Sequence, residues 1–202
     1  MSIKTTRSVG AEHFYEAGKT KGSRFLAHVF PCESVDFAKG QLETIRKKYP
    51  DATHHCWAWQ GAHRDHFRYS DDGEPTGSAG KPIHNAILGR TLVDVLVVVV
   101  RYFGGTKLGT GGLVRAYGGC AAEALDESPL VETVIKATLT FRCDYENVGL
   151  VQSMVNATAH ASVESEFKES VIMRVKVPVG KEVEFQEEVR ERSGGRVVSV
   201  ED

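Results

Sequence analysis

Residues 93–117 read VDVLVVVVRYFGGTKLGTGGLVRAY, and this stretch decides the fold of the chain around it. It begins with Val95–Val100, an apolar and mostly β-branched run that has the length of a strand buried on both faces. Glycines then interrupt the chain repeatedly, and a helical pattern begins at Leu113. A buried strand that leads through a glycine-rich loop into a helix presents unpaired backbone N–H groups, and such groups bind anions.

The loop after this strand carries only positive charge. Between Val95 and Ala122 there is no acidic residue, although the whole chain has a formal net charge of -2. An anion or a nucleic-acid backbone requires N–H groups, cations and no competing carboxylates, and the loop offers all three. Its two aromatic side chains could stack on bases; in the alternative, the glycines only form tight turns and both aromatic side chains point into the core. The predicted anion- or nucleic-acid-binding residues are Arg101, Tyr102, Phe103, Gly104, Gly105, Lys107, Gly109, Gly111, Gly112 and Arg115, with Lys81 nearby.

The composition is that of an ordinary soluble globular protein, with 41% hydrophobic and 26% charged residues. A length of 202 residues allows one large domain or two small ones. A sequence pI near 6.5 excludes a wholly basic, histone-like binder, so any nucleic-acid contact must come from a local patch. No signal-peptide pattern is visible, the longest apolar run is about a third of a membrane span, and the four cysteines are scattered. We therefore expect a cytoplasmic protein with free thiols and no membrane contact.

Periodicity and turn signals predict the other elements of the first 132 residues. Lys21-Gly22-Ser23 is typical of a hairpin turn between two strands. Ser34 can cap a helix whose apolar positions recur every three or four residues up to Tyr49. Gly118-Gly119 lie inside the helix that begins at Leu113, which predicts close packing of another backbone there. The remaining segments are a ragged start over 1–11, strands over 13–20, 24–30, 54–60 and 66–70, and a helix over 83–88.

A turn rich in acidic residues precedes the helix predicted at 83–88. Its carboxylates could hold Mg²⁺, but the EF-hand pattern is absent and Pro75 restricts the backbone. The favoured alternative is a solvated acidic turn, or an ion pair with Lys81 or Arg101 that locks the loop. The candidate magnesium ligands are Asp71, Asp72 and Glu74. Small residues at the start of the following helix could help the main loop to hold a phosphate: Thr76, Ser78 and Gly80.

A boundary is predicted at residues 129–133, which divides the chain into domains 1–132 and 133–202. From Ile135 to Cys143 apolar and polar residues alternate, as in a half-buried strand. A helix, a hairpin, a glutamate-rich helix ended by Gly194-Gly195 and a last strand follow. This β-α-β-β-α-β order is the ferredoxin-like arrangement. The predicted fold class is therefore α+β, in two domains.

Two long motifs carry a resemblance to a known family. Residues 70–82 have the pattern SDDGEPxGxAGKP, and residues 101–113 have the pattern RYFGGxKLGxGGL. With Lys21-Gly22-Ser23-Arg24-Phe25 and His54-His55-Cys56, they resemble the IMPACT family, and within it the bacterial YigZ type. The resemblance covers about residues 15–128 with highly specific motifs, while residues 135–202 are similar to the second domain of the bacterial members at the level of pattern.

The resemblance implies an N-terminal domain like domain IV of elongation factor G, a ribosomal-protein-like fold shared with GHMP kinases. It implies a C-terminal domain like domain V of that factor, and no established enzymatic activity. We therefore expect a non-enzymatic cytosolic protein that associates with RNA or the ribosome in translation regulation. We predict no catalytic residue and no cofactor, and the sequence does not indicate an oligomeric state.

Two other functions stay open. The segment Leu108–Leu113 at a helix start is similar to the phosphate loop of GHMP kinases, which favours a nucleotide or phosphate site in which Asp72 or Glu74 would hold Mg²⁺. The third hypothesis is an adaptor that binds only a protein partner.

Overall fold

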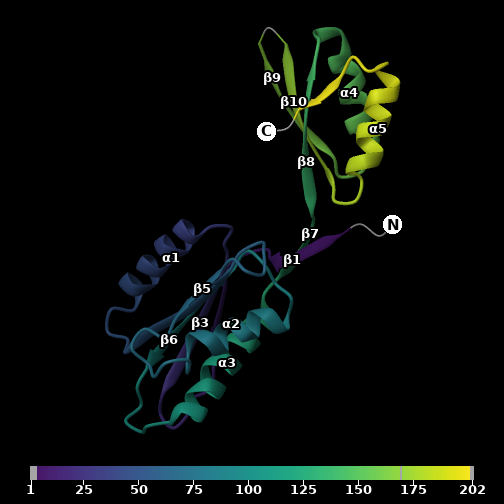
Figure 1. Cartoon of the computed structure of the whole chain (residues 1–202). Helices are drawn as coiled ribbons and strands as arrows, with labels where there is room; N and C mark the ends of the chain where they lie inside the picture. Colours follow the sequence, from purple (N-terminus) through teal and green to yellow (C-terminus); the bar gives the residue numbers. More distant parts are fainter. Residues whose placement is uncertain (1–3, 169, 201–202) are drawn as a thin grey trace. The chain divides into compact units, whose positions relative to one another are not determined.

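The computed structural model describes residues 4–168 and 170–200, drawn in Figure 1. The chain forms two compact units: residues 7–132 make up one, and residues 4–6 with 133–200 belong to the other. Within these described ranges no helix has the length and hydropathy of a membrane span. Both long sequence motifs lie in the unit of residues 7–132.

This unit is built on a five-stranded antiparallel sheet that is covered by helices on both faces. In chain order its elements are β2 (His13–Glu16), β3 (Arg24–Pro31), α1 (Val35–Lys48), β4 (His54–Gln60), β5 (Phe67–Ser70), α2 (Gly80–Gly89), β6 (Val95–Tyr102) and α3 (Thr110–Glu127). The sheet order is β2-β3-β6-β4-β5. Helix α1 covers one face, and α2 and α3 cover the other (Figure 1).

Strand β6 is the centre of the sheet and confirms the prediction made from its valines. All residues of Val95–Val100 are fully buried. Because side chains alternate along a strand, the odd-numbered residues join the core beneath α2 and α3, and the even-numbered residues join the core beneath α1. Its neighbours β3 and β4 pair with it over nearly its whole length. The residues that follow β6 therefore continue from a strand that is buried and paired on both edges.

The predicted hairpin and the first helix are also confirmed. Strands β2 and β3 pair in antiparallel register, and the turn between them uses positive φ angles at Lys21 (46°) and Gly22 (82°). The Ser34 hydroxyl accepts a 3.2 Å hydrogen bond from the backbone N–H of Phe37 at the start of α1. Helix α1 ends before Pro50 with basic residues in its last turn.

The structure corrects the expectation of a ragged start, and the chain forms a strand at the predicted boundary. Strands β1 (Thr5–Val9) and β7 (Leu130–Val134) occupy these positions and pair in a two-stranded sheet. Four of the five residues of β7 are exposed. The alternation of buried and exposed side chains, by which a strand is normally found in a sequence, is therefore missing there.

The glycine pair inside α3 has space for a side-chain methyl group at both of its positions. A Cβ atom built on Gly118 would lie 3.5 Å from Cβ of Pro82 in α2, which is an ordinary van der Waals distance. A Cβ built on Gly119 would meet nothing within 4 Å. Gly118 therefore faces α2, but the predicted close approach of another backbone is seen at neither position.

The second unit has the predicted ferredoxin-like order. Its elements are β8 (Lys136–Cys143), α4 (Tyr145–Ala157), β9 (Ser162–Phe167), β10 (Val171–Pro178), α5 (Glu182–Arg192) and β11 (Val198–Val200). The antiparallel sheet has the order β11-β8-β10-β9. The alternate residues Val171, Met173, Val175 and Val177 of β10 are fully buried in one core with residues of both helices.

A close backbone contact joins the β2–β3 turn to the glycine loop after β6. A Cβ atom built on Gly104 would lie 1.9 Å from the carbonyl carbon of Gly22. No side chain fits in that space, so this position requires glycine. The contact brings the turn at Lys21 to the loop that leads into α3.

We expect Gly104→Ala to lower the free energy of unfolding of this unit by roughly 1–3 kcal/mol, because the added methyl group overlaps the Gly22 backbone. The control is Gly119→Ala, which we expect to raise stability by up to about 1 kcal/mol, because alanine favours a helix and space is free. Urea unfolding followed by tryptophan fluorescence measures both, since Trp57 and Trp59 lie in β4 of this unit. Equal midpoints for the two variants would contradict the contact.

Candidate anion-binding site at the start of helix α3

The start of α3 exposes backbone N–H groups that no part of the described chain satisfies. The first helical hydrogen bond runs from the Leu113 N–H to the Gly109 carbonyl oxygen. Gly109 adopts a positive φ of 71° and provides no side-chain cap. The N–H groups of Thr110, Gly111 and Gly112 therefore lack acceptors among the described residues. Together with the helix dipole they favour an anion at this end of α3.

Two hollows flank this helix start, and both carry cations. One has a volume of about 350 Å³ and is lined by residues that include Phe103, Lys107 and Thr110. The other has a volume of about 240 Å³, and its lining includes Lys21, Gly112 and Arg115. Leu108 lines both, so it divides them. Three cationic side chains thus surround one helix terminus.

The three cations are not engaged elsewhere in the described part of the chain. Lys21, Lys107 and Arg115 are exposed, and none of them forms an ion pair or a side-chain hydrogen bond with a described residue. A Cβ atom built on Gly111 would lie 3.7 Å from Nη1 of Arg115, so this guanidinium lies over the helix start. The predicted residues Lys107 and Arg115 are therefore brought to the same place as the open amides.

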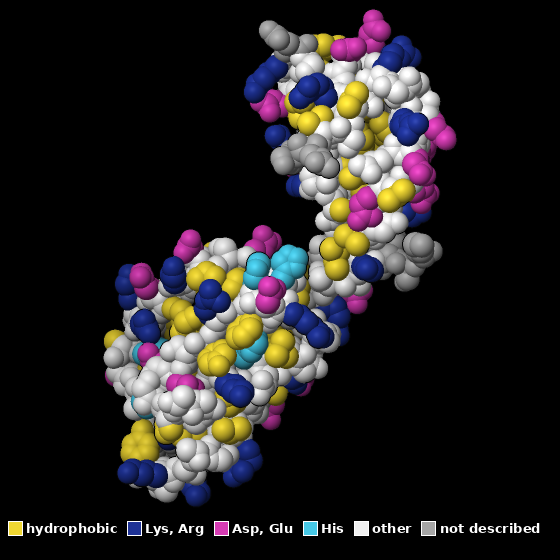
Figure 2. Space-filling model, in the orientation of Figure 1, with side chains coloured by type: hydrophobic (Ala, Val, Ile, Leu, Met, Phe, Trp, Pro, Cys, Tyr) yellow, Lys and Arg dark blue, Asp and Glu magenta, His cyan; other side chains and the backbone are white. Residues whose placement is uncertain are grey.

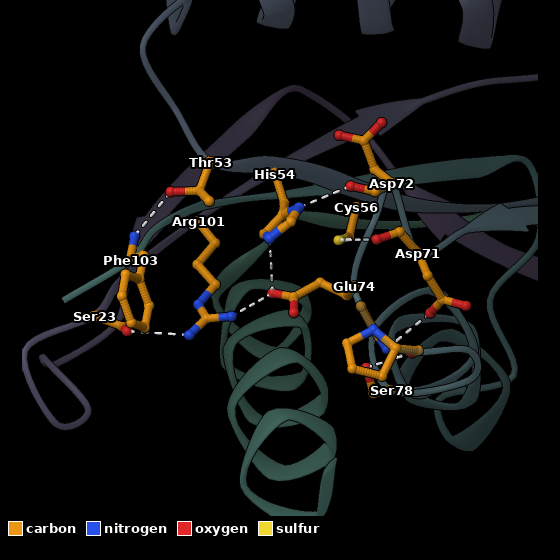
Figure 3. Close-up of polar contacts among 12 residues, drawn as sticks. Ser23, Thr53, His54, Cys56, Asp71, Asp72, Glu74, Ser78, Arg101 and Phe103 are labelled. Carbon is orange, nitrogen blue, oxygen red and sulfur yellow. Dashed lines mark hydrogen bonds and ion pairs between the residues drawn. The ribbon is translucent and has the colours of Figure 1, made fainter. Parts of the chain in front are cut away.

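Arg101 has a different role from that of the exposed cations. Its side chain points to the core face of β6 and is buried, with 4% of its surface exposed. Nη1 donates to Oε1 of Glu74 at 2.5 Å, and Nη2 donates to the Ser23 hydroxyl at 3.3 Å (Figure 3). The ion pair that locks the acidic loop, one of the alternatives from the sequence, is confirmed. The charge of Arg101 is neutralised inside the protein, so it is not offered to a phosphate as the charges of Lys107 and Arg115 are.

Glu74 is the acceptor at the centre of a buried polar cluster. Its Oε1 also accepts a 2.7 Å hydrogen bond from the Tyr117 hydroxyl, and Nε2 of His54 lies 3.7 Å from the same atom (Figure 3 shows His54). Burial raises the pKa of Tyr117, and the neighbouring Cys56 and Glu74 raise it further. Burial likewise raises the pKa of the Cys56 thiol, which donates to the Asp71 carbonyl oxygen. Both groups therefore stay protonated at neutral pH, and Cys56 is a poor nucleophile.

The start of α2 is already filled by a carboxylate. Asp71 accepts hydrogen bonds from the N–H groups of Gly77, Ala79 and Gly80 at 2.8–2.9 Å. Partial burial raises the pKa of Asp71, but these three donors outweigh it and hold the pKa below its ordinary value. The idea that Thr76, Ser78 and Gly80 help to hold a phosphate is therefore wrong, because the protein supplies its own anion at this helix start.

The three acidic residues of this turn do not form a ligand set for Mg²⁺. Asp72 accepts from the His55 backbone N–H at 2.6 Å and from Arg46 at 3.1 Å, while Asp71 and Glu74 serve the donors described above. Within residues 4–168 and 170–200, no three His, Cys, Asp or Glu side chains are grouped so that they could hold a metal ion. The magnesium hypothesis is corrected for this reason: each carboxylate already accepts hydrogen bonds from donors of the surrounding protein.

The two aromatic residues of the loop lie differently. Phe103 is 47% exposed, its ring centroid lies 5.6 Å from Cζ of Arg101, and it borders the larger hollow of the site. Tyr102 packs partly against the core beneath α1 and donates its hydroxyl to Asp51 at 3.0 Å. Burial and the Asp51 carboxylate raise the pKa of Tyr102. Phe103 is therefore the aromatic side chain that is placed to stack on a ligand at this site.

The remaining predicted residues lie as follows. Gly104 is held by the contact with Gly22, and its N–H donates to the Ser23 hydroxyl. Gly105 adopts a positive φ of 86° and is exposed. Lys81 lies in the first turn of α2 and lines a separate hollow. It is not part of the group around α3.

Comparison with known proteins places these residues in a family. A family model described as the Impact N-terminal domain matches residues 21–125, and one described as a domain of unknown function matches residues 141–196. The chain belongs to the IMPACT family. The residues of the site, Lys21 to Arg115, all fall within the part that the Impact N-terminal model covers.

Several IMPACT family members are similar along most of the chain. YigZ of Escherichia coli is 35% identical over 178 residues, which cover 87% of each chain. A Thermus thermophilus member is 42% identical over 79% of this chain and 87% of its own, and YvyE of Bacillus subtilis is 34% identical over 84% and 73%. A crystal structure of a hypothetical protein superimposes with a TM-score of 0.78 at 30% identity and covers 100% of this chain and 98% of the other.

Sequence reasoning missed Lys21 as a member of the site. The turn that holds it was predicted, but its position beside Gly112 and Arg115 results from the tertiary contact between Gly22 and Gly104. The signal that could have found it is the Lys-Gly-Ser-Arg-Phe motif, which this IMPACT chain carries together with the glycine loop.

We expect Arg101→Ala to destabilise the unit of residues 7–132 by about 3 kcal/mol or more, because it leaves the Glu74 carboxylate buried without its cation. Lys107→Ala, which removes a cation from the same loop at the surface, should change stability by less than about 0.5 kcal/mol. Urea unfolding followed by tryptophan fluorescence measures the difference. If Arg101→Ala unfolds at the wild-type midpoint, the buried ion pair does not have the structural role assigned to it.

Proposed function

We propose that this protein is a non-enzymatic binder of single-stranded RNA, with the phosphate backbone held at the start of α3. The observation that carries the proposal is the meeting of open backbone N–H groups with exposed cations. Thr110, Gly111 and Gly112 supply the amides, and Lys21, Lys107 and Arg115 supply the positive charge. Among the described residues that line the two hollows, Glu74 is the one acidic residue, and it is buried against Arg101.

Charge complementarity favours a polyanion over a single small anion. Figure 2 shows Lys and Arg side chains gathered at the end of this unit where the loop before α3 lies. Cations on both sides of Leu108 suit successive phosphates of one strand, because each hollow offers its own positive side chain. The exposed ring of Phe103 adds a surface on which a base can stack, as in other proteins that bind single strands.

We propose that the bound RNA belongs to the ribosome. The corresponding role of the protein is translation regulation in the cytoplasm. This step rests on the resemblance of the two motifs to the IMPACT family and, through it, to domains IV and V of elongation factor G. The ferredoxin-like order of the second unit agrees with that resemblance. Fold analogy is a weaker argument for function than the site itself, so the RNA contact is what the experiment must test first.

A nucleotide or phosphate site at the same helix start is the alternative. The hollow of about 350 Å³ beside Thr110 is large enough for a small ligand, which is the observation that favours it. An adaptor that binds only a protein partner is the third proposal, and it would require neither the open amides nor the cations.

Filter binding of a single-stranded RNA oligonucleotide at low and moderate salt tests the proposal. We expect Lys107→Ala/Arg115→Ala to weaken retention by at least about tenfold at low salt and to flatten the salt dependence by about one to two units of slope, because phosphate contacts are lost.

The matched control is Lys39→Ala/Lys47→Ala, which removes two exposed cations from α1 on the other face of the sheet. It should bind like the wild type. Equal retention of RNA by the wild type and by both double variants would remove the α3 site from consideration as the RNA contact.

A further inference from the structure

A separate hollow lies between β5 and α2, apart from the residues of the α3 site. It has a volume of about 480 Å³, within the range of roughly 300–1,000 Å³ that is usual for small-ligand pockets. Its walls combine aromatic side chains with the apolar side chain of Leu88. Figure 2 shows hydrophobic side chains grouped around a His side chain, between Lys or Arg side chains, over α2. None of this hollow is used by the function proposed above.

The aromatic wall consists of three rings in nearly parallel orientation. Phe67 and Tyr69 are two residues apart on β5, so they project from the same face of the strand. Their ring centroids lie 6.2 Å apart with an interplanar angle of 7°, and the His84 ring stacks on Phe67 at 4.5 Å. Tyr69 is 42% exposed, so the wall is open to a ligand on its outer part.

The wall is held in place from behind. His84 is buried, and its Nε2 donates to Oε1 of Gln60 at 3.0 Å. The amide of Gln60, which is also buried, donates in turn to the backbone oxygen of His63 at 2.7 Å. The ring that supports the aromatic wall therefore cannot rotate without breaking buried hydrogen bonds. Such preorganisation reduces the entropic cost of binding a flat ligand.

The rim of the hollow is cationic and lacks acidic residues. Lys81 from the first turn of α2 and Arg64 from the β4–β5 connection both line it. Neither forms an ion pair or a side-chain hydrogen bond with a described residue. No Asp or Glu is among the described residues that line the hollow. A ligand that complements this surface has a flat apolar part and a negative group.

The backbone on one side of the hollow is strained. Thr91, a β-branched residue that lines it, adopts a positive φ of 53°. This conformation is a genuine outlier for a β-branched residue and is energetically unfavourable. Residues held in this way cluster at ligand sites, which agrees with a binding role for the hollow.

We propose that the hollow between β5 and α2 binds a nucleotide. The base stacks on the wall of Tyr69 and Phe67, and Lys81 and Arg64 hold the phosphate. A free mononucleotide and a nucleotide within an RNA strand share this chemistry, and the experiment separates the two sources. The proposal does not depend on the α3 site, because no described residue lines both this hollow and those at α3.

Isothermal titration of the full chain with adenosine monophosphate, adenosine, inorganic phosphate and a single-stranded oligoadenylate tests the proposal. The variants are Tyr69→Ala and Lys81→Ala. We expect each to weaken binding of the phosphorylated ligand by about tenfold, since loss of one base–aromatic stack or one phosphate contact has an effect of that order. The matched control is Phe37→Ala/Lys47→Ala on α1, where Phe37 is 48% exposed, comparable to Tyr69.

Each outcome has a clear meaning. Binding of adenosine monophosphate that weakens in both pocket variants, but not in the control or in Lys107→Ala/Arg115→Ala, supports a free nucleotide as the ligand. Binding of the oligoadenylate alone, with the same dependence on Tyr69 and Lys81, supports an RNA nucleotide. Binding of either ligand that is unchanged in Tyr69→Ala and Lys81→Ala, or no binding at millimolar ligand, overturns the proposal even if the α3 site binds RNA. Circular dichroism shows whether each variant is folded.

Discussion

The buried ion pair between Arg101 and Glu74 is the interaction on which the rest of the functional unit depends. Removing two charges from water is costly, and their mutual attraction offsets this cost only if further hydrogen bonds complete the cluster. Ser23 from the β2–β3 turn and Tyr117 from α3 supply two such bonds, while Nε of Arg101 is buried without a partner among the described residues. One pair therefore ties the acidic turn, the end of β6, the hairpin turn and α3 together, which explains why the two long motifs of the chain belong to one structure.

This internal pairing determines what the surface offers. Glu74 forms a buried ion pair with Arg101, and Asp71 caps α2. Neither residue of the acidic turn therefore contributes a free carboxylate to the start of α3. The two helix starts therefore differ. At α2 the Asp71 carboxylate accepts from the backbone N–H groups, while at α3 these groups have no acceptor among the described residues and lie near Lys107 and Arg115. The external anion that we propose at α3 would bind there for the same physical reason that the Asp71 carboxylate binds at the start of α2.

Much of this fold could be predicted from the sequence, where a local pattern has a single structural solution. The valines of β6, the Ser34 cap and the strand–helix order after Ile135 are such cases. The inward position of Arg101 could not be predicted from the sequence, because an arginine side chain at the end of a strand can point into solvent or pair with a buried carboxylate. Its partner Glu74 is 27 residues away in the sequence, and only the tertiary fold brings the two side chains together. Lys21 was missed for the same reason, and β7 because its side chains are mostly exposed.

The central claim is that the amides at the start of α3 receive the negative charge of the ligand. A titration of the ¹⁵N-labelled full chain with single-stranded RNA, followed by backbone amide chemical shifts, tests it most directly. The account predicts that the amides of Thr110, Gly111 and Gly112 are among those that shift most, because an acceptor would bond to N–H groups that have none in the free protein. If RNA binds while these three resonances stay in place and the largest shifts fall in β8–β11, the account is contradicted.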